Sequence, residues 1–148
     1  MYGNIGINTD YRGILRMHIF VCIDNNNGML FNNRRQSRDR ILIEKVKEIT
    51  ENSWLWIRDF SRTLFPDDVI VDNDMLTKAG EEDYCFVEDV PLNPYTDKID
   101  EIYVFRWNRD YPSDTFFDID MLKNFSLKST EDFKGSSHDK ITLERWVK

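Results

Sequence analysis

Residues 17–30 read MHIFVCIDNNNGML, and this stretch indicates the fold more clearly than any other part of the chain. Its first eight residues form a largely apolar run with β-branched and aromatic side chains, and the turn-forming sequence NNNG follows at once. Such a run predicts a buried strand that ends in a turn. Because apolar residues fall on both faces of this strand, we expect it in the middle of a sheet that is covered on both sides.

The rest of the chain alternates between helical and strand patterns and then turns to strands alone. Residues 37–50, SRDRILIEKVKEIT, carry apolar residues at helical spacing, with Ser37 as the predicted N-cap. Strands are also predicted at 53–57, 67–72, 83–89, 101–107, 115–120, 125–133 and 140–148, with short helical segments at 58–65 and 73–80. This order predicts an α/β fold with a mainly parallel central sheet, helices on both faces and a C-terminal antiparallel hairpin.

The composition is that of a folded, acidic domain. The 148 residues are 41% hydrophobic and 32% charged, with a formal net charge of -7. No apolar run approaches the roughly 20 residues of a membrane helix, and the N-terminus lacks the apolar core of a signal peptide. We therefore expect a cytoplasmic protein with no membrane partner. The acidic balance also argues against general nucleic-acid binding.

Cysteine and histidine do not suggest a metal site. Cys22 and Cys85 each lie within an apolar run, which is typical of reduced core thiols. No pair of Cys or His residues has the spacing of a zinc site, so no metal is predicted. His18 shares the first strand with apolar neighbours and is predicted to be a hydrogen-bonded core residue.

Several segments, taken in order, resemble dihydrofolate reductase. HIFVCIDNNNGML is similar to the first strand of that family and the turn after it, and residues 28–50 fit its loop and first helix without a gap. YTDKIDEIYVF resembles a later strand, and DTFF, SLKSTEDF and ITLERWVK resemble the closing strands. The resemblance implies a single dihydrofolate reductase-like domain over residues 17–148. Residues 1–16 have no counterpart, and we expect them to be an added arm or a start-site extension.

The segments GMLF, RRQSRDR and GSSH are also similar to those of short bacterial proteins that carry the name ribonuclease Z. Enzymes with that activity use a histidine-rich site with two metal ions. This chain contains only 2 histidines, His18 and His138, so its residues do not support that activity.

Three departures from the family's pattern argue against reductase activity. The family holds its pterin with a carboxylate on the first helix, and the gapless count places Leu42 there, although Asp39 lies one turn earlier and a register shift would restore an acid. The glycine pair that admits the phosphates of the nicotinamide cofactor is replaced by Glu88-Asp89. The Gly-Arg-x-Thr segment of the cofactor site keeps only Arg58. We therefore expect no cofactor, with residual NADPH-dependent reductase activity as a distant alternative.

The resemblance also implies that three loops lie together over the substrate cleft. They are the arginine-rich sequence NNRRQSRDR, residues 108–114 and residues 134–140. Guanidinium groups bind phosphate or carboxylate in a forked geometry, and the glycine before two serines in the third loop frees backbone N–H groups for an anion. The predicted ligand-binding residues are Arg34, Arg35, Ser37, Arg38, Arg40, Asn108, Arg109, Asp114, Ser136, Ser137 and Lys140.

If the protein is an enzyme, His138 and Asp39 are its predicted catalytic residues, because an imidazole suits proton transfer near neutral pH. His138 also fits a plain turn residue. The sequence neighbours Ser136, Ser137 and His138 are not expected to form a triad among themselves. We expect at least two of the four arginines of the first loop to face the loops that carry Arg109 and His138.

Two classes of function fit these residues. In the first, the protein binds, and if an enzyme hydrolyses, a phosphorylated small molecule or nucleotide-like anion at the three-loop cluster. In the second, it is a non-enzymatic, acidic interaction or inhibitor protein with a filled cleft and an exposed apolar or acidic patch. A solvated surface with internal ion pairs from Asp39, Asp114 and Asp139 would also explain the arginine run.

Overall fold

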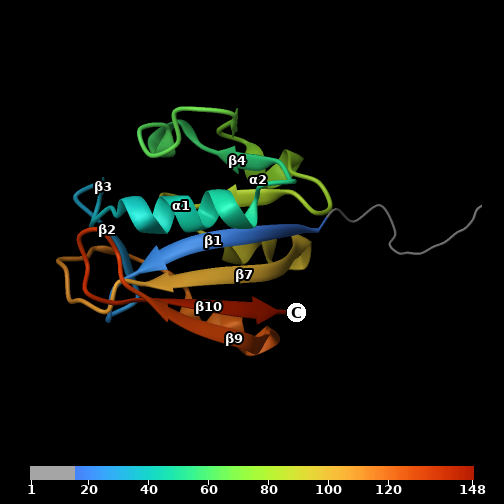
Figure 1. Ribbon diagram of the computed structural model, residues 1–148. Coiled ribbons are helices and arrows are strands. Elements are labelled where there is room, and N and C mark those ends of the chain that lie inside the picture. Colours follow the sequence, from blue (N-terminus) through green and yellow to red (C-terminus); the bar gives the residue numbers. More distant parts are fainter. Residues whose placement is uncertain (1–15) are drawn as a thin grey trace, which may run out of the picture.

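The computed structural model describes residues 16–148 and has the α/β architecture predicted from the sequence (Figure 1). All but one residue of the predicted N-terminal arm lies outside this described range. In chain order the elements are β1 (Met17–Ile23), β2 (Gly28–Phe31), β3 (Arg34–Arg35), α1 (Arg40–Ile49), β4 (Leu55–Ile57), η1 (Asp59–Ser61), β5 (Ile70–Val71), α2 (Met75–Lys78), β6 (Tyr84–Phe86), η2 (Asn93–Lys98), β7 (Ile99–Arg106), β8 (Thr115–Phe116), η3 (Ile119–Asn124), β9 (Ser126–Phe133) and β10 (Ile141–Val147), where η marks a 3-10 helix.

A seven-stranded sheet in the order β5-β4-β6-β1-β7-β10-β9 forms the centre of the protein. β1 pairs in parallel with β6 and β7, and β4 pairs in parallel with β5 and β6. β10 runs antiparallel to both β7 and β9, which makes the C-terminal hairpin. β1 occupies the middle because it is apolar on both faces, with Ile19, Phe20 and Val21 fully buried. The predicted fold class is confirmed.

Alternate residues of β1 contribute to two hydrophobic cores, one on each face of the sheet. Ile19 belongs to the core that includes Met75 of α2, together with residues of η3. Phe20 belongs to the other core, where it packs with Leu42 and Val46 of α1. Helical segments therefore cover both faces, with α1 lying across the front of the sheet in Figure 1. Within residues 16–148, none of the helices is long and apolar enough to cross a membrane.

The first helix begins at a different residue from the one predicted. Its N-cap is Asp39 rather than Ser37, and the Asp39 carboxylate accepts hydrogen bonds from the backbone N–H groups of Ile41 (2.9 Å) and Leu42 (3.3 Å). A carboxylate suits this position because it satisfies unpaired N–H groups and interacts favourably with the helix dipole. Ser37 consequently lies outside the helix, in the loop before it.

Two short segments also differ from the sequence prediction. Residues 115–120 do not form one strand: β8 ends at Phe116 and pairs with β2 in a small sheet of order β3-β2-β8. The chain then enters η3, where the Asp118 carboxylate caps the N–H group of Asp120 at 3.2 Å. The helical segment predicted at 58–65 forms only the three residues of η1. The Asp118 cap starts η3 in place of a longer strand, whereas the N-cap of η1 makes no side-chain hydrogen bond and turns follow that short helix.

Candidate functional site

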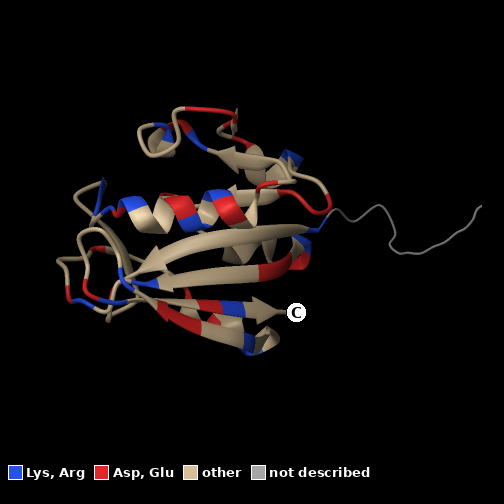
Figure 2. Ribbon diagram, in the orientation of Figure 1, with Lys and Arg blue, Asp and Glu red and all other residues tan. Residues whose placement is uncertain are grey.

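Three loops meet at the carboxyl end of β1, which is the end of a parallel sheet where ligands commonly bind. We call residues 32–40, which end at the first residue of α1, the first loop, residues 108–114 the second loop and residues 134–140 the third loop. Gln36 Nε2 of the first loop donates to Ser113 Oγ of the second at 2.7 Å. Ser137 Oγ of the third loop donates to the backbone oxygen of Arg38 at 3.1 Å. In Figure 2, cationic and anionic residues are interspersed in these loops.

Asp39 is the residue that joins the first loop to the third. Its Oδ1 accepts from the first turn of α1 and from Ser136 N (2.9 Å). Its Oδ2 accepts from Ser137 N (2.9 Å) and Ser137 Oγ (3.2 Å) and pairs with His138 Nδ1 (2.9 Å). Burial alone would raise the pKa of this carboxyl, but hydrogen bonds from Ser137, His138 and Ser136 outweigh burial and hold the pKa well below its usual range. The acid therefore stays ionised, and both of its oxygens are fully engaged.

Gly135 makes this close approach possible. A Cβ atom at this position would lie 2.3 Å from Asp39 Oδ2, so no larger residue fits without moving the loop. The backbone N–H groups of Ser136 and Ser137, which were predicted to receive an external anion, are occupied by Asp39. Ser136 Oγ accepts from the backbone N–H group of Arg40 at 3.0 Å. The anion that the third loop binds is thus a carboxylate of the protein itself.

His138 is buried, with only 4% of its surface exposed, and it contacts all three loops. While Nδ1 faces Asp39, Nε2 lies 3.0 Å from Ser37 Oγ and 2.9 Å from Tyr111 OH. The imidazole also stacks on Trp107, with ring centroids 4.6 Å apart and an interplanar angle of 25°. Because ionised Asp39 accepts the Nδ1 proton, we assign Nε2 of the neutral ring as an acceptor for a hydroxyl proton. Ser37, His138 and Asp39 form one continuous hydrogen-bonded series.

The four arginines of the first loop lie in different surroundings. Arg40 lies beside Glu44 of its own helix at 3.9 Å, with both side chains largely exposed. Arg34 borders an open groove together with Tyr111 of the second loop. Arg38 lines a separate pocket beside α1. We expected at least two of these guanidinium groups to face the loops that carry Arg109 and His138. Arg34 and Arg35 do border one groove with Tyr111 of the second loop. Within residues 16–148, however, the side-chain hydrogen bonds and ion pairs of Arg35 and Arg40 go to other partners.

The fourth arginine, Arg35, binds Glu88, which the resemblance places at the family's glycine pair together with Asp89. Arg35 Nε and Nη2 donate to the two oxygens of Glu88, each at 2.8 Å, and Nη2 also donates to the backbone oxygen of Phe60 at 3.0 Å. Arg58 Nε donates to Asp89 Oδ1 at 3.1 Å. Forked arginine–carboxylate pairs are strong and geometrically specific. The region that the resemblance assigns to cofactor phosphates is therefore bridged by two internal ion pairs.

The remaining predicted residues hold the second loop in place. Asn108 Nδ2 donates to the backbone oxygen of Lys140 at 3.1 Å, which ties the second loop to the third. Asp114 Oδ2 accepts from the backbone N–H group of Asn32 at 3.1 Å, which ties it to the first. Arg109 is exposed, and its backbone oxygen accepts a hydrogen bond from the turn after β1. These contacts tie the second loop to its two neighbours and to the turn after β1.

Sequence reasoning did not identify Asp24, a buried acid just after β1. Asp24 accepts from the backbone N–H groups of Gly28 (2.7 Å) and Tyr111 (3.1 Å), from Ser113 Oγ (3.1 Å) and from Gln36 Nε2 (3.2 Å). Burial raises the pKa of this carboxyl, but the backbone hydrogen bonds from Gly28 and Tyr111 reverse the effect, and the pKa is lowered. An acid directly after a buried apolar strand was the available signal. Trp107, just before the second loop, and Tyr111, within it, were also missed as partners of His138.

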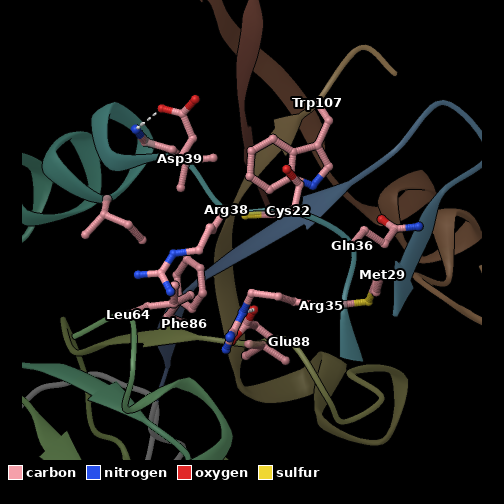
Figure 3. Close-up of a pocket in the computed structure, with 14 residues that line it drawn as sticks. Cys22, Met29, Arg35, Gln36, Arg38, Asp39, Leu64, Phe86, Glu88 and Trp107 are labelled. Carbon is pink, nitrogen blue, oxygen red and sulfur yellow. Dashed lines mark hydrogen bonds and ion pairs between the residues drawn. The ribbon is translucent and has the colours of Figure 1, made fainter. Parts of the chain in front are cut away.

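A narrow pocket opens between the first loop, α1 and β6 (Figure 3). The space inside it that admits water is about 20 Å³, which suits one or two water molecules, so a larger ligand must sit at its mouth. Burial, followed by the charge of Glu88, raises the pKa of the Cys22 thiol well above its usual value, so this thiol stays protonated. Within residues 16–148 no cluster of three or more His, Cys, Asp or Glu residues is placed to hold a metal ion. The pocket is lined by Cys22, Met29, Arg35, Gln36, Ser37, Arg38, Asp39, Leu42, Ile43, Leu64, Phe86, Val87, Glu88 and Trp107.

Two polar groups of this pocket have binding capacity left over. Among the described residues, no carboxylate lies within ion-pair distance of Arg38, in contrast to Arg35. Gln36 Oε1 is buried and accepts no hydrogen bond from the described part of the chain. Its Nε2 donates to Asp24 Oδ2 and Ser113 Oγ, so the amide oxygen and nitrogen of Gln36 are assigned the right way round. Figure 3 shows the amide oxygen of Gln36 on the side toward the pocket.

No protein-family model matches the chain, and no curated protein matches it in sequence. Among solved structures, it is similar to dihydrofolate reductase from Enterococcus faecalis in complex with NADP(H) and RAB-propyl. The TM-score is 0.66 at 12% sequence identity, and the match covers 89% of this chain and 95% of that chain. The chain therefore has a dihydrofolate reductase-like fold. A fold shared at this identity does not establish a shared activity.

Proposed function

We propose that this protein binds a small phosphorylated or nucleotide-like anion at the mouth of the pocket beside Arg38, and that it is not a dihydrofolate reductase. The observation that carries the proposal is the contrast between two arginines of one loop. Arg35 is neutralised by a forked ion pair with Glu88, whereas Arg38 lines the same pocket with no carboxylate partner among residues 16–148. A guanidinium group next to an apolar wall attracts an anion more strongly than one in open water.

Gln36 supports a ligand that also carries a hydrogen-bond donor. Its buried Oε1 has no protein donor within residues 16–148, and a buried acceptor without a partner costs about 1–3 kcal/mol. An N–H or O–H group of the ligand would satisfy this oxygen. An anionic group for Arg38 and a donor for Gln36 together describe a phosphorylated molecule with a polar ring or sugar.

The absence of reductase chemistry is supported by three features of the same region. The carboxylate of Asp39 has no lone pair left for a pterin, since six donors surround its two oxygens. Leu42, which the gapless count places at the position of the family's acid, is 1% exposed and packs in the core. Glu88 and Asp89 bring side chains and negative charge to the place of the glycine pair.

Thermal melting with inorganic phosphate and with AMP tests the anion proposal. A ligand present at about 100 times its dissociation constant stabilises the folded state by about 2.7 kcal/mol, so the melting temperature should rise with concentration. Arg38→Ala should abolish this rise. Arg40→Ala is the matched control, because Arg40 is an exposed arginine of the same segment outside the pocket, and it should keep the rise. An unchanged melting temperature with both anions, or an equal rise in Arg38→Ala, would count against the site.

Calorimetric titration with NADPH tests the other half of the proposal. We expect no stoichiometric binding at micromolar concentration, because two ion-paired carboxylates stand where pyrophosphate would approach. Tight binding of one NADPH per chain would show that the cofactor site survives.

The interaction-protein alternative also has specific support. Phe31 and Phe116 are 42% and 55% exposed, and they belong to two paired strands of the small sheet. The narrow pocket agrees with the filled cleft expected for such a protein. If neither anion stabilises the chain, this alternative becomes the better explanation.

A further inference from the structure

The hydrogen-bonded series of Ser37, His138 and Asp39 is more than anion binding requires. We propose that Ser37 is a nucleophile that hydrolyses a carboxylic ester, with His138 as its general base and Asp39 as the positioning residue. The preference for an ester that carries an anionic group rests on the proposed function of Arg38. The reactivity of Ser37 does not depend on it.

The distances in the series are those that a nucleophile and its base need. Ser37 Oγ lies 3.0 Å from His138 Nε2, and His138 Nδ1 lies 2.9 Å from Asp39 Oδ2. A nucleophile and base in this role lie about 2.6–3.2 Å apart, with the base oriented by a third group. The series therefore has the geometry by which an activated serine is recognised, whatever the order of its members in the chain.

The imidazole is held rigidly in this orientation. The backbone N–H groups of Ser136 and Ser137 anchor Asp39, and the ring of Trp107 stacks against His138. A base that is already oriented does not lose conformational freedom when the reaction begins. Ser37 is half-buried and lines the pocket, so the residue that carries this hydroxyl group borders the space where a substrate would bind.

Tyr111 OH also approaches His138 Nε2, at 2.9 Å. A neutral imidazole nitrogen has one lone pair, so the two hydroxyl groups share it. Tyr111 borders the neighbouring groove, whereas Ser37 lines the pocket beside Arg38. We therefore assign the nucleophile to Ser37 and a ring-orienting role to Tyr111.

The reaction balances with water as the only co-substrate. Ser37 Oγ attacks the ester carbonyl carbon while its proton moves to His138 Nε2. The tetrahedral adduct collapses, the bond to the alcohol oxygen breaks, and the alcohol leaves with that proton. Water then attacks the acyl-serine, passes a proton through Nε2 back to Ser37 Oγ, and releases the carboxylic acid. Asp39 stays ionised and keeps the Nδ1 proton in place throughout.

Diisopropyl fluorophosphate tests the nucleophile directly, because it is small, neutral and reacts with activated serines. Intact-protein and peptide mass spectrometry should find one diisopropylphosphoryl group, on Ser37, with fluoride and a proton released. Ser37→Ala lacks the hydroxyl group that would carry the adduct, so its labelling should be lost. Ser136→Ala is the matched control, since its hydroxyl lies in the same loop cluster and accepts from Arg40 N, and it should label normally.

The burst of 4-nitrophenolate from 4-nitrophenyl acetate should follow the same pattern across these variants. Wild-type protein without an adduct on Ser37 would overturn the proposal, as would an adduct that survives in Ser37→Ala. Arg38→Ala separates the two proposals: it should lose stabilisation by phosphate while keeping its reaction with the neutral probe.

Discussion

Replacing Asp39 with Asn is the most informative perturbation, because it removes a charge while keeping the size of the side chain. Oδ1 of the amide can still accept from Ser136 N and from the first turn of α1, so the helix cap survives. The new NH₂ group takes the place of Oδ2, where it faces the N–H group of Ser137 and His138 Nδ1. Two donors then point at each other where an acceptor is needed.

The loss of stability follows from these contacts. Leaving the Ser137 N–H group without an acceptor costs about 1–3 kcal/mol, and the loss of the charge-assisted bond to His138 adds about 1 kcal/mol. We therefore expect the free energy of unfolding to fall by about 2–4 kcal/mol, a substantial part of the roughly 5–15 kcal/mol of a typical domain. His138 would respond by moving its proton to Nε2 and accepting from the Asn amide. Ser37 would then lose its base, and its labelling rate should fall by about 10³–10⁴-fold.

Urea unfolding followed by tryptophan fluorescence measures the stability change, since Trp107 stacks on His138. For a slope of about 2 kcal/mol per molar, the midpoint should fall by about 1–2 M. Asp114→Asn is the control, because this acid is an exposed partner of Asn32 N, and its effect should stay within about 0.5 kcal/mol. A midpoint for Asp39→Asn equal to that of wild type would refute the structural role assigned to this carboxylate.

The lowered pKa of the Asp39 carboxyl predicts how the stability of the protein depends on pH. The folded-state pKa of Asp39 is lowered, so its contribution is present above the unfolded-state pKa of about 3.9 and is lost as pH falls below that value toward the folded-state pKa. Between neutral pH and about pH 5 this contribution should remain constant. Wild-type protein should lose more stability on acidification below about pH 4 than Asp39→Asn does, and parallel stability curves for the two proteins would contradict this linkage.

Three further changes have defined outcomes. Gly135→Ala should lower the free energy of unfolding, measured in urea, by about 1–3 kcal/mol, because its Cβ would lie 2.3 Å from a carboxylate oxygen. Gly80→Ala is the control and should cost far less, because the nearest contact of its Cβ would be 3.5 Å. Equal costs for the two variants would contradict the packing argument. Glu88→Gln should cost about 1–3 kcal/mol by weakening the fork to Arg35, and an unchanged midpoint would show that the pair does not hold the loop. A chain that starts at Met17 should keep a cooperative melting transition, and failure to fold would place the N-terminal arm in the core.

The main features of the fold could be predicted from the sequence, because they depend on patterns within single segments. The apolar run of residues 17–24 indicated a central strand, and the helical spacing of residues 37–50 indicated the helix over one face of the sheet. The late change from alternating elements to strands indicated the C-terminal hairpin. The boundaries were less accurate: Ser37 and Asp39 are both good N-caps, and only the position of the third loop decides between them.

The arrangement of the candidate site was decided by tertiary contacts. Ser37 and His138 are 101 residues apart and Asp39 and His138 are 99 apart, so nothing local in the sequence indicates that they form one hydrogen-bonded series. The sequence did indicate arginine, serine and histidine in three loops, and the family resemblance indicated that these loops meet. The sequence did not reveal that Arg35 pairs with Glu88. It also did not reveal that the Asp39 carboxylate accepts hydrogen bonds from the backbone N–H groups that were predicted to bind an external anion. The physical reason is that a side chain binds whichever complementary partner the packed backbone brings within about 3 Å, and strand register and loop packing determine that distance.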